Sequence, residues 1–238
     1  MLIWRAIQYS TGDTNRDSSM AAWVSLALRG RGVPVTELNE DDELPRGSVY
    51  VSRARGRSTL ERLADRERCG ALVVNSTAAV RLCADREQLE RRLREAGIDV
   101  PGTYQGSGPC WLKRNDAPGD VVFARDAQEL EQQQQLYRER GISAWTVSPH
   151  VEGRQVKFYG VAGTDFFRTY GADAPALRAQ AEHAARVAGL TVYGGDAIVR
   201  ADGTVCLVDL NDWPSFSPCV VEAADVIAQR VIDMSSER

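Results

Sequence analysis

The 238-residue chain is 43% hydrophobic and 26% charged, which leaves enough apolar residues for a buried core in one domain or in two closely joined lobes. Its net charge of −4 argues against general nucleic-acid binding. No apolar run approaches the roughly 18 residues of a membrane span. Residues 1–5 turn polar too early for a signal peptide, so we expect a cytoplasmic protein without a membrane partner.

The cysteine and histidine content limits the chemistry further. The cysteines, at positions 69, 83, 110, 206 and 219, form no CxxC pair, so we expect reduced packing residues. The only histidines of the sequence are His150 and His183. They are too few for a His-rich zinc site and leave few bases for a Ser-His-Asp triad.

The first third of the chain alternates strand-like and helix-like patterns. Such alternation is typical of βαβ units and predicts a small parallel sheet. The expected strands are Leu2–Ile7, Val33–Glu37, Ser48–Ser52 and Ala71–Asn75, and the expected helices are Ser19–Arg29 and Leu60–Arg68.

A polar loop over residues 10–19, which includes Asn15, is expected after the first strand. Ligands gather beyond the carboxyl ends of the strands in a parallel sheet, so this loop can face a substrate. The alternative is a flexible connection in which Asp17 or Ser18 caps the next helix.

The second part of the chain begins with a helix expected over Asp85–Ala96, whose many Arg and Glu residues we interpret as a solvated face. After Pro101 the pattern changes to short strands joined by hairpins, with three further helices. The expected strands are Cys110–Lys113, Val121–Phe123, Ala144–Val147 and Val156–Val161, and the helices are Ala127–Arg140, Leu177–Leu190 and a last one with Ser217 as N-cap, Pro218 at its first position and an end near Asp233.

The most informative stretch places three oxygen-bearing side chains at the ends of two apolar strands. Asp196 is expected to end one strand and Asp209 and Asn211 the next, and the Asp202-Gly203 pair between the two predicts a hairpin. Because Asp209 and Asn211 are two residues apart, they point to one face of their strand. Oxygen ligands of this kind suit Mg²⁺. The alternative is a hairpin with polar ends.

The order of these elements resembles the ATP-grasp superfamily over nearly the whole chain, most specifically at the C-terminal end. The resemblance is carried by Lys113, Lys157, Arg168, Asp196, Asp209 and Asn211 in that order. It implies an α/β plus α+β fold in which a small N-terminal parallel α/β domain precedes two α+β lobes that clasp a nucleotide. The implied boundaries are 1–95 for the N-terminal domain, 96–147 for the first lobe and 148–238 for the second lobe, which carries the metal site.

The resemblance also implies roles for individual residues. Lys113 and Lys157 would contact the nucleotide phosphates, and Lys157 and Arg168 would meet the transition-state charge. The segment from Val147 to Gly153 resembles the hinge that reads the adenine, which makes Ser148, His150, Val151 and Glu152 candidate nucleotide-binding residues. Asp196, Asp209 and Asn211 would hold two Mg²⁺ ions. Exposed lysines, structural salt bridges and a packing histidine are the competing interpretations of these positions.

The acceptor substrate would lie between the metal site and the N-terminal domain. Arg53, Arg168 and Asn15 are our candidate substrate-binding residues there, because arginine suits bidentate carboxylate or phosphate binding. A solvated helix face explains much of the arginine run that follows Arg53. Trp213 and Phe216 either shape the acceptor pocket or belong to the core.

Carboxylate–amine ligation is the first function we infer from the resemblance. ATP with Mg²⁺ would phosphorylate a small-molecule carboxylate, and an amine would attack the acyl phosphate to give an amide with ADP and phosphate. An ATP-dependent small-molecule kinase and an inactive nucleotide-binding or partner-binding module are the alternatives. The oligomeric state stays open, a homodimer included.

Two positions depart from the family pattern. The glycine-rich loop that usually covers the phosphates is replaced by residues 114–120, which contain one glycine. Many of the ligases have Glu at the second metal position, where this chain has Asp209. In that respect the chain looks like the inositol-phosphate kinases of the superfamily.

Overall fold

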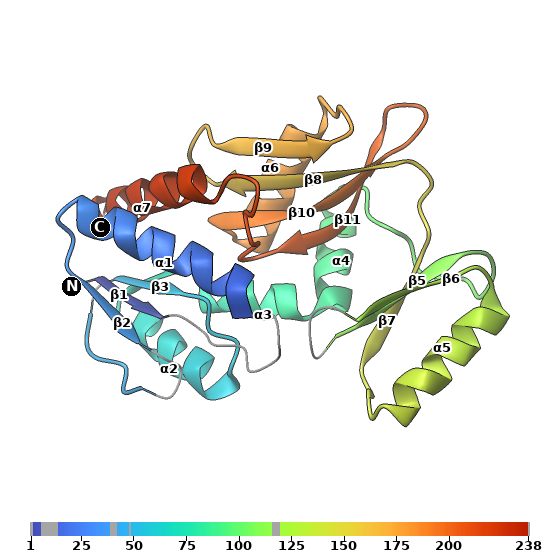
Figure 1. Cartoon of the computed structure of the whole chain (residues 1–238), viewed down its shortest axis with the longest axis horizontal. Coiled ribbons are helices and arrows are strands. Elements are labelled where there is room, and N and C mark those ends of the chain that lie inside the picture. The colour runs from blue at the N-terminus through green and yellow to red at the C-terminus, as the bar shows by residue number, and fades with distance from the viewer. Residues whose placement is uncertain (1, 6–13, 39–41, 48, 116–119, 238) are drawn as a thin grey trace.

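The computed structural model describes residues 2–5, 14–38, 42–47, 49–115 and 120–237, with the side chains of residues 2–5 and 14–19 left out. Three sheets follow one another along this chain (Figure 1). Among the described residues, none of the helices combines the length and the apolar character needed to cross a membrane.

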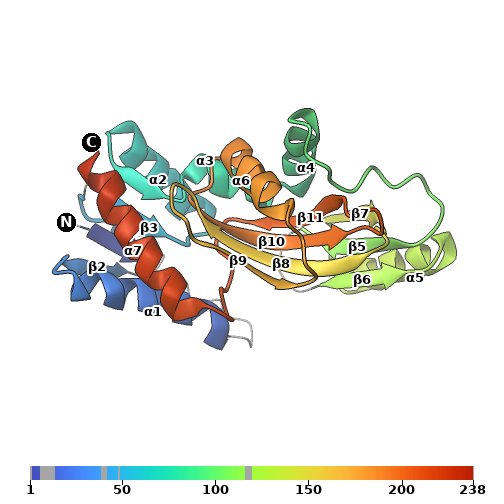
Figure 2. The ribbon, with the colours of Figure 1, turned by 90° about the horizontal axis from the view of Figure 1, so that it is seen from above.

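The first sheet is fully parallel, as the βαβ pattern predicts. Its strand order is β2-β1-β3-β4, and both neighbours of β1 run in its direction. Its helices lie on both sides of the sheet in Figure 2. The bounds are Leu2–Arg5 for β1, Thr14–Gly30 for α1, Val35–Leu38 for β2, Val49–Ser52 for β3, Arg57–Arg68 for α2, Leu72–Val74 for β4 and Thr77–Ala84 for α3.

The predicted loop over residues 10–19 is corrected by this part of the structure. Helix α1 already begins at Thr14, so the second half of that segment, including Asn15, is helical. Residues 10–13 lie outside the described residues. Helix formers such as Met20 and the alanines after it extend the helix backwards through a polar first turn, which carries no apolar periodicity to reveal it.

The second sheet is antiparallel, with order β6-β5-β7, and α5 covers one of its faces. Alternate residues of β5, such as Cys110 and Leu112, are buried against Leu130 and Tyr137 of α5. The other face of the sheet carries Trp111 and Lys113. The bounds are Arg86–Glu95 for α4, which precedes the sheet, Cys110–Arg114 for β5, Val121–Ala124 for β6, Ala127–Glu139 for α5 and Trp145–Pro149 for β7.

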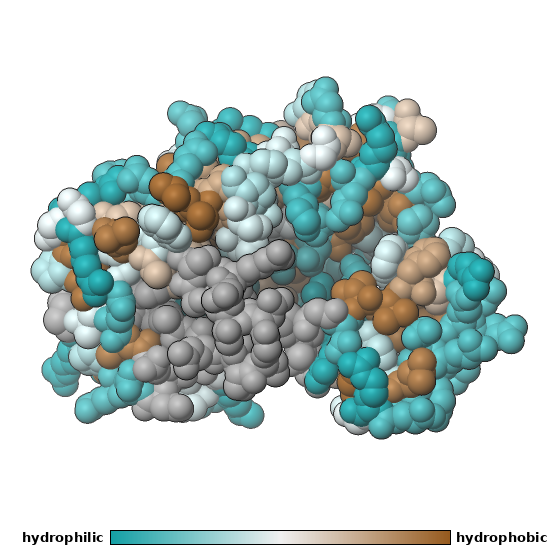
Figure 3. Space-filling view, in the orientation of Figure 1, coloured by the Kyte–Doolittle hydropathy of each residue, from teal (hydrophilic) through white to brown (hydrophobic). Residues whose placement is uncertain are grey.

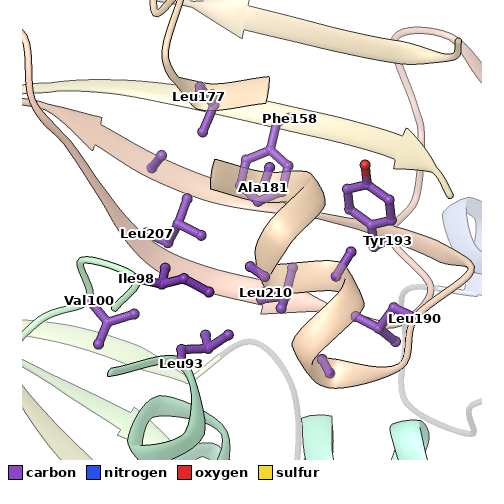
Figure 4. Close-up of a cluster of buried hydrophobic side chains, with 14 of the residues drawn as sticks. Leu93, Ile98, Val100, Phe158, Leu177, Ala181, Leu190, Tyr193, Leu207 and Leu210 are labelled. Atoms are coloured by element: carbon purple, nitrogen blue, oxygen red, sulfur yellow. The ribbon is translucent and has the colours of Figure 1, made fainter. Parts of the chain in front are cut away.

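The third sheet is antiparallel too, with order β11-β10-β8-β9. One face packs on α6 through a core that includes Phe158, Leu177 and Leu207 (Figure 4). The other face packs at one end on α7, which also lies along α1 (Figure 2). The bounds are Arg154–Val161 for β8, Phe167–Gly171 for β9, Leu177–Ala188 for α6, Val192–Val199 for β10, Val205–Asn211 for β11 and Val220–Ser236 for α7.

The structure corrects two predictions in this third part. Helix α7 begins at Val220 with Cys219 in the cap position, so Ser217 and Pro218 belong to the turn before the helix. Asp196 lies in the middle of β10, at a bulge, and does not end the strand. The predicted hairpin between β10 and β11 is confirmed, with Gly203 in the left-handed region at φ 84°.

Trp213 and Phe216 belong to the core, which decides between their two interpretations. Their side chains are 4% and 0% exposed, and Phe216 packs on Tyr159 of β8 with ring centroids 5.2 Å apart. Burial of this kind stabilises by roughly 1.5–3 kcal/mol for each large side chain. The segment after β11 is thereby fixed against the third sheet.

Candidate functional site

A cleft of about 230 Å³ separates the second and third sheets. Its walls combine the exposed face of β5 and β7 with Asp196 of β10 and Asp209 of β11, and Arg86 of α4 lies at its edge. In Figure 3, which shows one face of the molecule, the visible hydrophobic residues form small separate groups. A cleft that combines an apolar wall with a few charged groups is the usual form of a ligand site.

The register of the third sheet places the predicted metal ligands on one face. Asp196 lies opposite both Asp209 and Lys157, so these three side chains form one rung across β11, β10 and β8. Directly opposite residues in antiparallel strands share a face. Asn211 lies two residues beyond Asp209 and opposite Gly194, which places it on the same face one rung further.

Gly194 on that next rung is closely surrounded by other atoms. A Cβ atom at this position would lie 2.6 Å from the carbonyl oxygen of Phe158 and 2.8 Å from Pro214. No larger residue fits without a shift of the backbone. The close packing opposite Asn211 therefore requires glycine at position 194.

Asp196 and Asp209 face each other, which is unfavourable unless cations compensate their charges. Lys157 Nζ lies 2.8 and 3.0 Å from the two carboxylate oxygens of Asp196. Burial lowers the pKa of Lys157, but its hydrogen bond to Asp196 and the charge of that carboxylate raise the pKa more strongly, so the net shift is upward. Gln155 Nε2 donates a second hydrogen bond to Asp196 at 2.9 Å.

Asp209 is held from two sides. Arg86 Nη1 lies 3.0 Å from one carboxylate oxygen, and Asn211 Nδ2 donates to the other at 2.7 Å. The amide nitrogen of Asn211 is used in this bond, which leaves its side-chain oxygen as the atom suited to a cation. Within the described residues, no three His, Cys, Asp or Glu side chains gather closely enough to hold a metal. The site offers two carboxylates and one amide, and this set fits Mg²⁺, which usually takes one or two carboxylates beside water and phosphate.

Lys113 brings a further cation to the cleft from β5. Its Nζ donates to the carbonyl oxygen of Val208 at 3.1 Å, next to Asp209. Burial lowers the pKa of Lys113, and the charge of Asp209 opposes this effect only in part. Burial also raises the pKa of Glu90, a neighbour on α4, against the charge of Lys113. A desolvated ammonium at the wall of a cleft is suited to bind an anion.

Three of the four predicted nucleotide-binding residues in the hinge line the cleft: Ser148, His150 and Val151. Ser148 is buried on β7, and His150 accepts a 3.1 Å hydrogen bond at Nδ1 from the indole of Trp111. Glu152 is absent from the cleft wall as the structure describes it, and its side chain is 89% exposed.

The predicted substrate residues lie outside the described cleft wall. Arg168 on β9 forms an ion pair with Glu222 of α7, and its guanidinium lies 4.9 Å from the centre of the Phe166 ring. Arg53 is buried directly after β3. Asn15 is in α1, and its side chain is outside the described part of the chain.

Solved structures match this arrangement over almost the entire chain. The RimK domain ATP-grasp protein from Sphaerobacter thermophilus has 20% sequence identity and a TM-score of 0.74, with 98% of this chain and 100% of that chain covered. D-alanine–D-alanine ligase from Bacillus anthracis, complexed with ATP, has 12% identity and a TM-score of 0.75, with 99% and 98% covered. The chain has the ATP-grasp fold. The resemblance stated from the sequence is confirmed at this level.

A third ATP-grasp structure adds ligands to the comparison. The ligase PsnB, complexed with a minimal precursor, Mg and ADP, shares 17% identity at a TM-score of 0.68, with 99% of this chain and 98% of that chain covered. No protein-family model and no curated protein matches the sequence of this chain.

Two groups of residues were missed by the sequence reasoning. Arg86 was included in a solvated helix face, although its position at the N-terminus of α4 directs it to Asp209, 123 residues away. Asp212 and Asn75 are polar and fully buried, and each contacts a distant part of the chain. Asp212 directly after the predicted metal ligand Asn211 was a usable signal, because an acid next to a strand end that is buried needs a cationic partner.

Proposed function

We propose that this protein is an ATP- and Mg²⁺-dependent ligase that joins a carboxylate to an amine. The observation that carries the proposal is the rung on which Asp196 and Asp209 face each other in a cleft between two antiparallel sheets, with Lys157, Arg86 and Lys113 around them. Two neighbouring carboxylates can bind the metal ion of a metal–polyphosphate complex, and the cations beside them can bind its phosphates.

The two ends of the cleft would bind different parts of the nucleotide. The end with Ser148, His150 and Val151 offers an apolar wall and backbone groups, which suit the adenine base. The end with Lys113 and Arg86 carries positive charge, which suits the phosphates. The face that β5 and β7 share forms this wall of the cleft.

Asp196, Asp209 and Asn211 are the residues that would hold Mg²⁺, in two ions as the resemblance implies. When bound, Mg²⁺ neutralises charge on the phosphate oxygens and orients them. Lys157 and Arg86, which now balance the two carboxylates, would turn to the phosphate oxygens as the metal takes over that role. Arg168 would approach from β9 once it leaves its exposed ion pair with Glu222.

The proposed ligation proceeds in two steps. A carboxylate oxygen of the first substrate attacks the γ-phosphorus of ATP, and the bond from that phosphorus to the bridging oxygen breaks, which gives an acyl phosphate and ADP. The amine nitrogen then attacks the acyl carbon, the carbon–oxygen bond to phosphate breaks, and the nitrogen loses a proton. The cations of the cleft stabilise the charge that develops in the first step.

A small-molecule kinase of the same fold is the second candidate. The observation that favours it is Asp209, whose side chain is one methylene shorter than the Glu of many ligases. A hydroxyl would replace the carboxylate as attacking group, and a phosphorylated product would form without an amine.

Calorimetric titration of ATP into the full-length protein, with and without Mg²⁺, tests the shared part of both functions. Asp209→Asn keeps the shape of the side chain but removes one carboxylate charge, so we expect at least a tenfold loss of Mg²⁺-dependent affinity. Asp225→Asn is the matched control, because Asp225 also pairs with an arginine, Arg31, but lies exposed on α7. The Mg²⁺-dependent affinity of the Asp225→Asn variant for ATP should equal that of the unaltered protein.

Product analysis then separates the candidates. ADP release that needs both an acid and an amine supports the ligase, and release with polyols alone supports the kinase. If the folded protein fails to bind Mg·ATP, both enzyme functions are wrong and an interaction module remains. Nucleotide binding without turnover on any acceptor class leaves the inactive nucleotide-binding module.

A further inference from the structure

The residue after β11, Asp212, forms a half-buried ion pair with the N-terminal part of the chain. Asp212 follows Asn211 directly and is 5% exposed although it is charged. Arg55, in the segment between β3 and α2, contacts both of its carboxylate oxygens, at 2.7 Å through Nη1 and 2.6 Å through Nη2. Such a bidentate pair fixes orientation as well as distance.

Asn75 makes a second set of contacts with this region. It lies between β4 and α3 and is 1% exposed. Its Oδ1 accepts hydrogen bonds from the backbone N–H groups of Thr191 and Val192, both at 2.8 Å. Its Nδ2 donates to the carbonyl oxygens of Val192, at 2.7 Å, and of Asp212. All four hydrogen-bonding positions of this amide are therefore used.

These contacts tie together the two strands that carry the predicted metal ligands. Asn75 joins the start of β10 to the residue after β11, and Arg55 holds that same residue through its side chain. The last residue of an edge strand is otherwise free to fray, and a ligand that moves by a fraction of an ångström weakens a metal site. The position of Asn211 thus depends on residues more than 130 positions earlier in the chain.

We propose that Arg55, through Asp212, is a positioning residue for the metal site, so that Mg²⁺ affinity depends on this one contact from the N-terminal part of the chain. Arg55 itself touches neither metal nor nucleotide in this proposal. It acts by fixing the backbone that presents Asn211. The inference rests on the proposed function, because it assumes that Asn211 holds Mg²⁺.

The test measures the Mg²⁺ concentration at which ATP binding to the full-length protein is half-maximal. Asp212→Asn keeps the size of the side chain but removes the charge that Arg55 holds, and Arg55→Lys keeps the charge but loses the bidentate contact. For each variant we expect this concentration to rise roughly tenfold, the usual cost of losing a partner behind a metal ligand. ATP affinity without Mg²⁺ should stay unchanged. Binding of Mn²⁺ alone, followed by electron paramagnetic resonance, should weaken in parallel.

Arg31→Met is the matched control. It removes another ion pair between the N-terminal part and α7, in which Arg31 Nη2 lies 2.6 Å from Asp225, far along the chain from β11. Thermal unfolding of all variants separates loss of fold from loss of position, and folded Arg31→Met protein should keep the original Mg²⁺ requirement. An equal shift in Arg31→Met, or no shift in folded Asp212→Asn and Arg55→Lys, overturns the inference while the proposed function stands. If the unaltered protein does not bind Mg·ATP, the proposed function and this inference both fail.

Discussion

Asn75→Ala should be one of the most damaging single substitutions outside the cleft. The change removes the acceptor of two buried N–H groups, those of Thr191 and Val192, and the donor to two carbonyl oxygens. Each buried group left without a partner costs about 1–3 kcal/mol. The two N–H groups alone therefore predict a loss of about 2–6 kcal/mol. Folded domains are stable by only about 5–15 kcal/mol, so this is a large share.

Urea unfolding followed by tryptophan fluorescence measures this loss. Asn115→Ala is the control, because the Asn115 side chain is exposed and accepts a hydrogen bond from the Thr146 hydroxyl at 3.0 Å. A surface change of this kind should stay within about 0.5 kcal/mol. If Asn75→Ala loses less than about 1 kcal/mol with an unchanged dependence on urea, the contacts of Asn75 do not stabilise the fold as argued.

Three further substitutions test the site itself. Lys113→Met should weaken ATP binding in calorimetry. It should also stabilise the ligand-free protein against urea at neutral pH, because burial lowers the pKa of the Lys113 ammonium. The folded state therefore binds this proton less tightly than the unfolded chain does. That gain should shrink as the pH rises towards 10.5, the ordinary pKa, and a pH-independent difference would contradict the reasoning. Gly195→Ala would place a Cβ 2.0 Å from the carbonyl oxygen of Asp209, so thermal unfolding should show a large loss of stability that Gly30→Ala, with nothing within 4 Å, does not share. Arg168→Ala removes an exposed ion pair with Glu222, a hydrogen bond to the carbonyl oxygen of Phe167 and the contact with the Phe166 ring, so stability should fall by about 1–2 kcal/mol while ADP release falls at least tenfold; full turnover would exclude Arg168 from the reaction.

The sheets were predictable because their signals are local. Period-two alternation on β5 and β8 separates a buried face from a cleft face, and the Asp202-Gly203 turn sets the register between β10 and β11. Continued without interruption, that register would place Asp196 opposite Val208, and the bulge between Asp196 and Ala197 shifts it so that Asp196 lies opposite Asp209. The convergence of the predicted metal ligands thus depends on the turn together with this bulge, which the turn and the alternating patterns do not predict.

The ends of the helices were less predictable, because competing signals lie close together. Ser217-Pro218 reads as a cap followed by a first helical residue, yet Phe216 is buried against Tyr159 and adopts a positive φ of 50°. The packing of that ring fixes the turn and delays α7 to Val220. Tertiary contacts override a cap signal when a large side chain must be buried.

The polar contacts between distant segments left no pattern in the sequence. An apolar face repeats with the period of its helix or strand, whereas a buried amide such as Asn75 or an ion pair such as Arg55–Asp212 needs only one residue at each end. In the sequence, Arg86 looks the same as the exposed arginines of α4. Only its position at the N-terminus of the helix distinguishes it from them.

The candidate site therefore combines side chains from three parts of the chain. Lys113 comes from the second sheet, Arg86 from α4, and the two carboxylates from the third sheet. The second sheet has its own core with α5, whereas Leu89 and Leu93 of α4 share the core of the third sheet, so Lys113 meets the other charges only when the second sheet is docked. Variants at the contacts between the second sheet and the rest of the site should for this reason change nucleotide affinity before they change secondary structure, and circular dichroism recorded beside the binding measurements distinguishes the two effects.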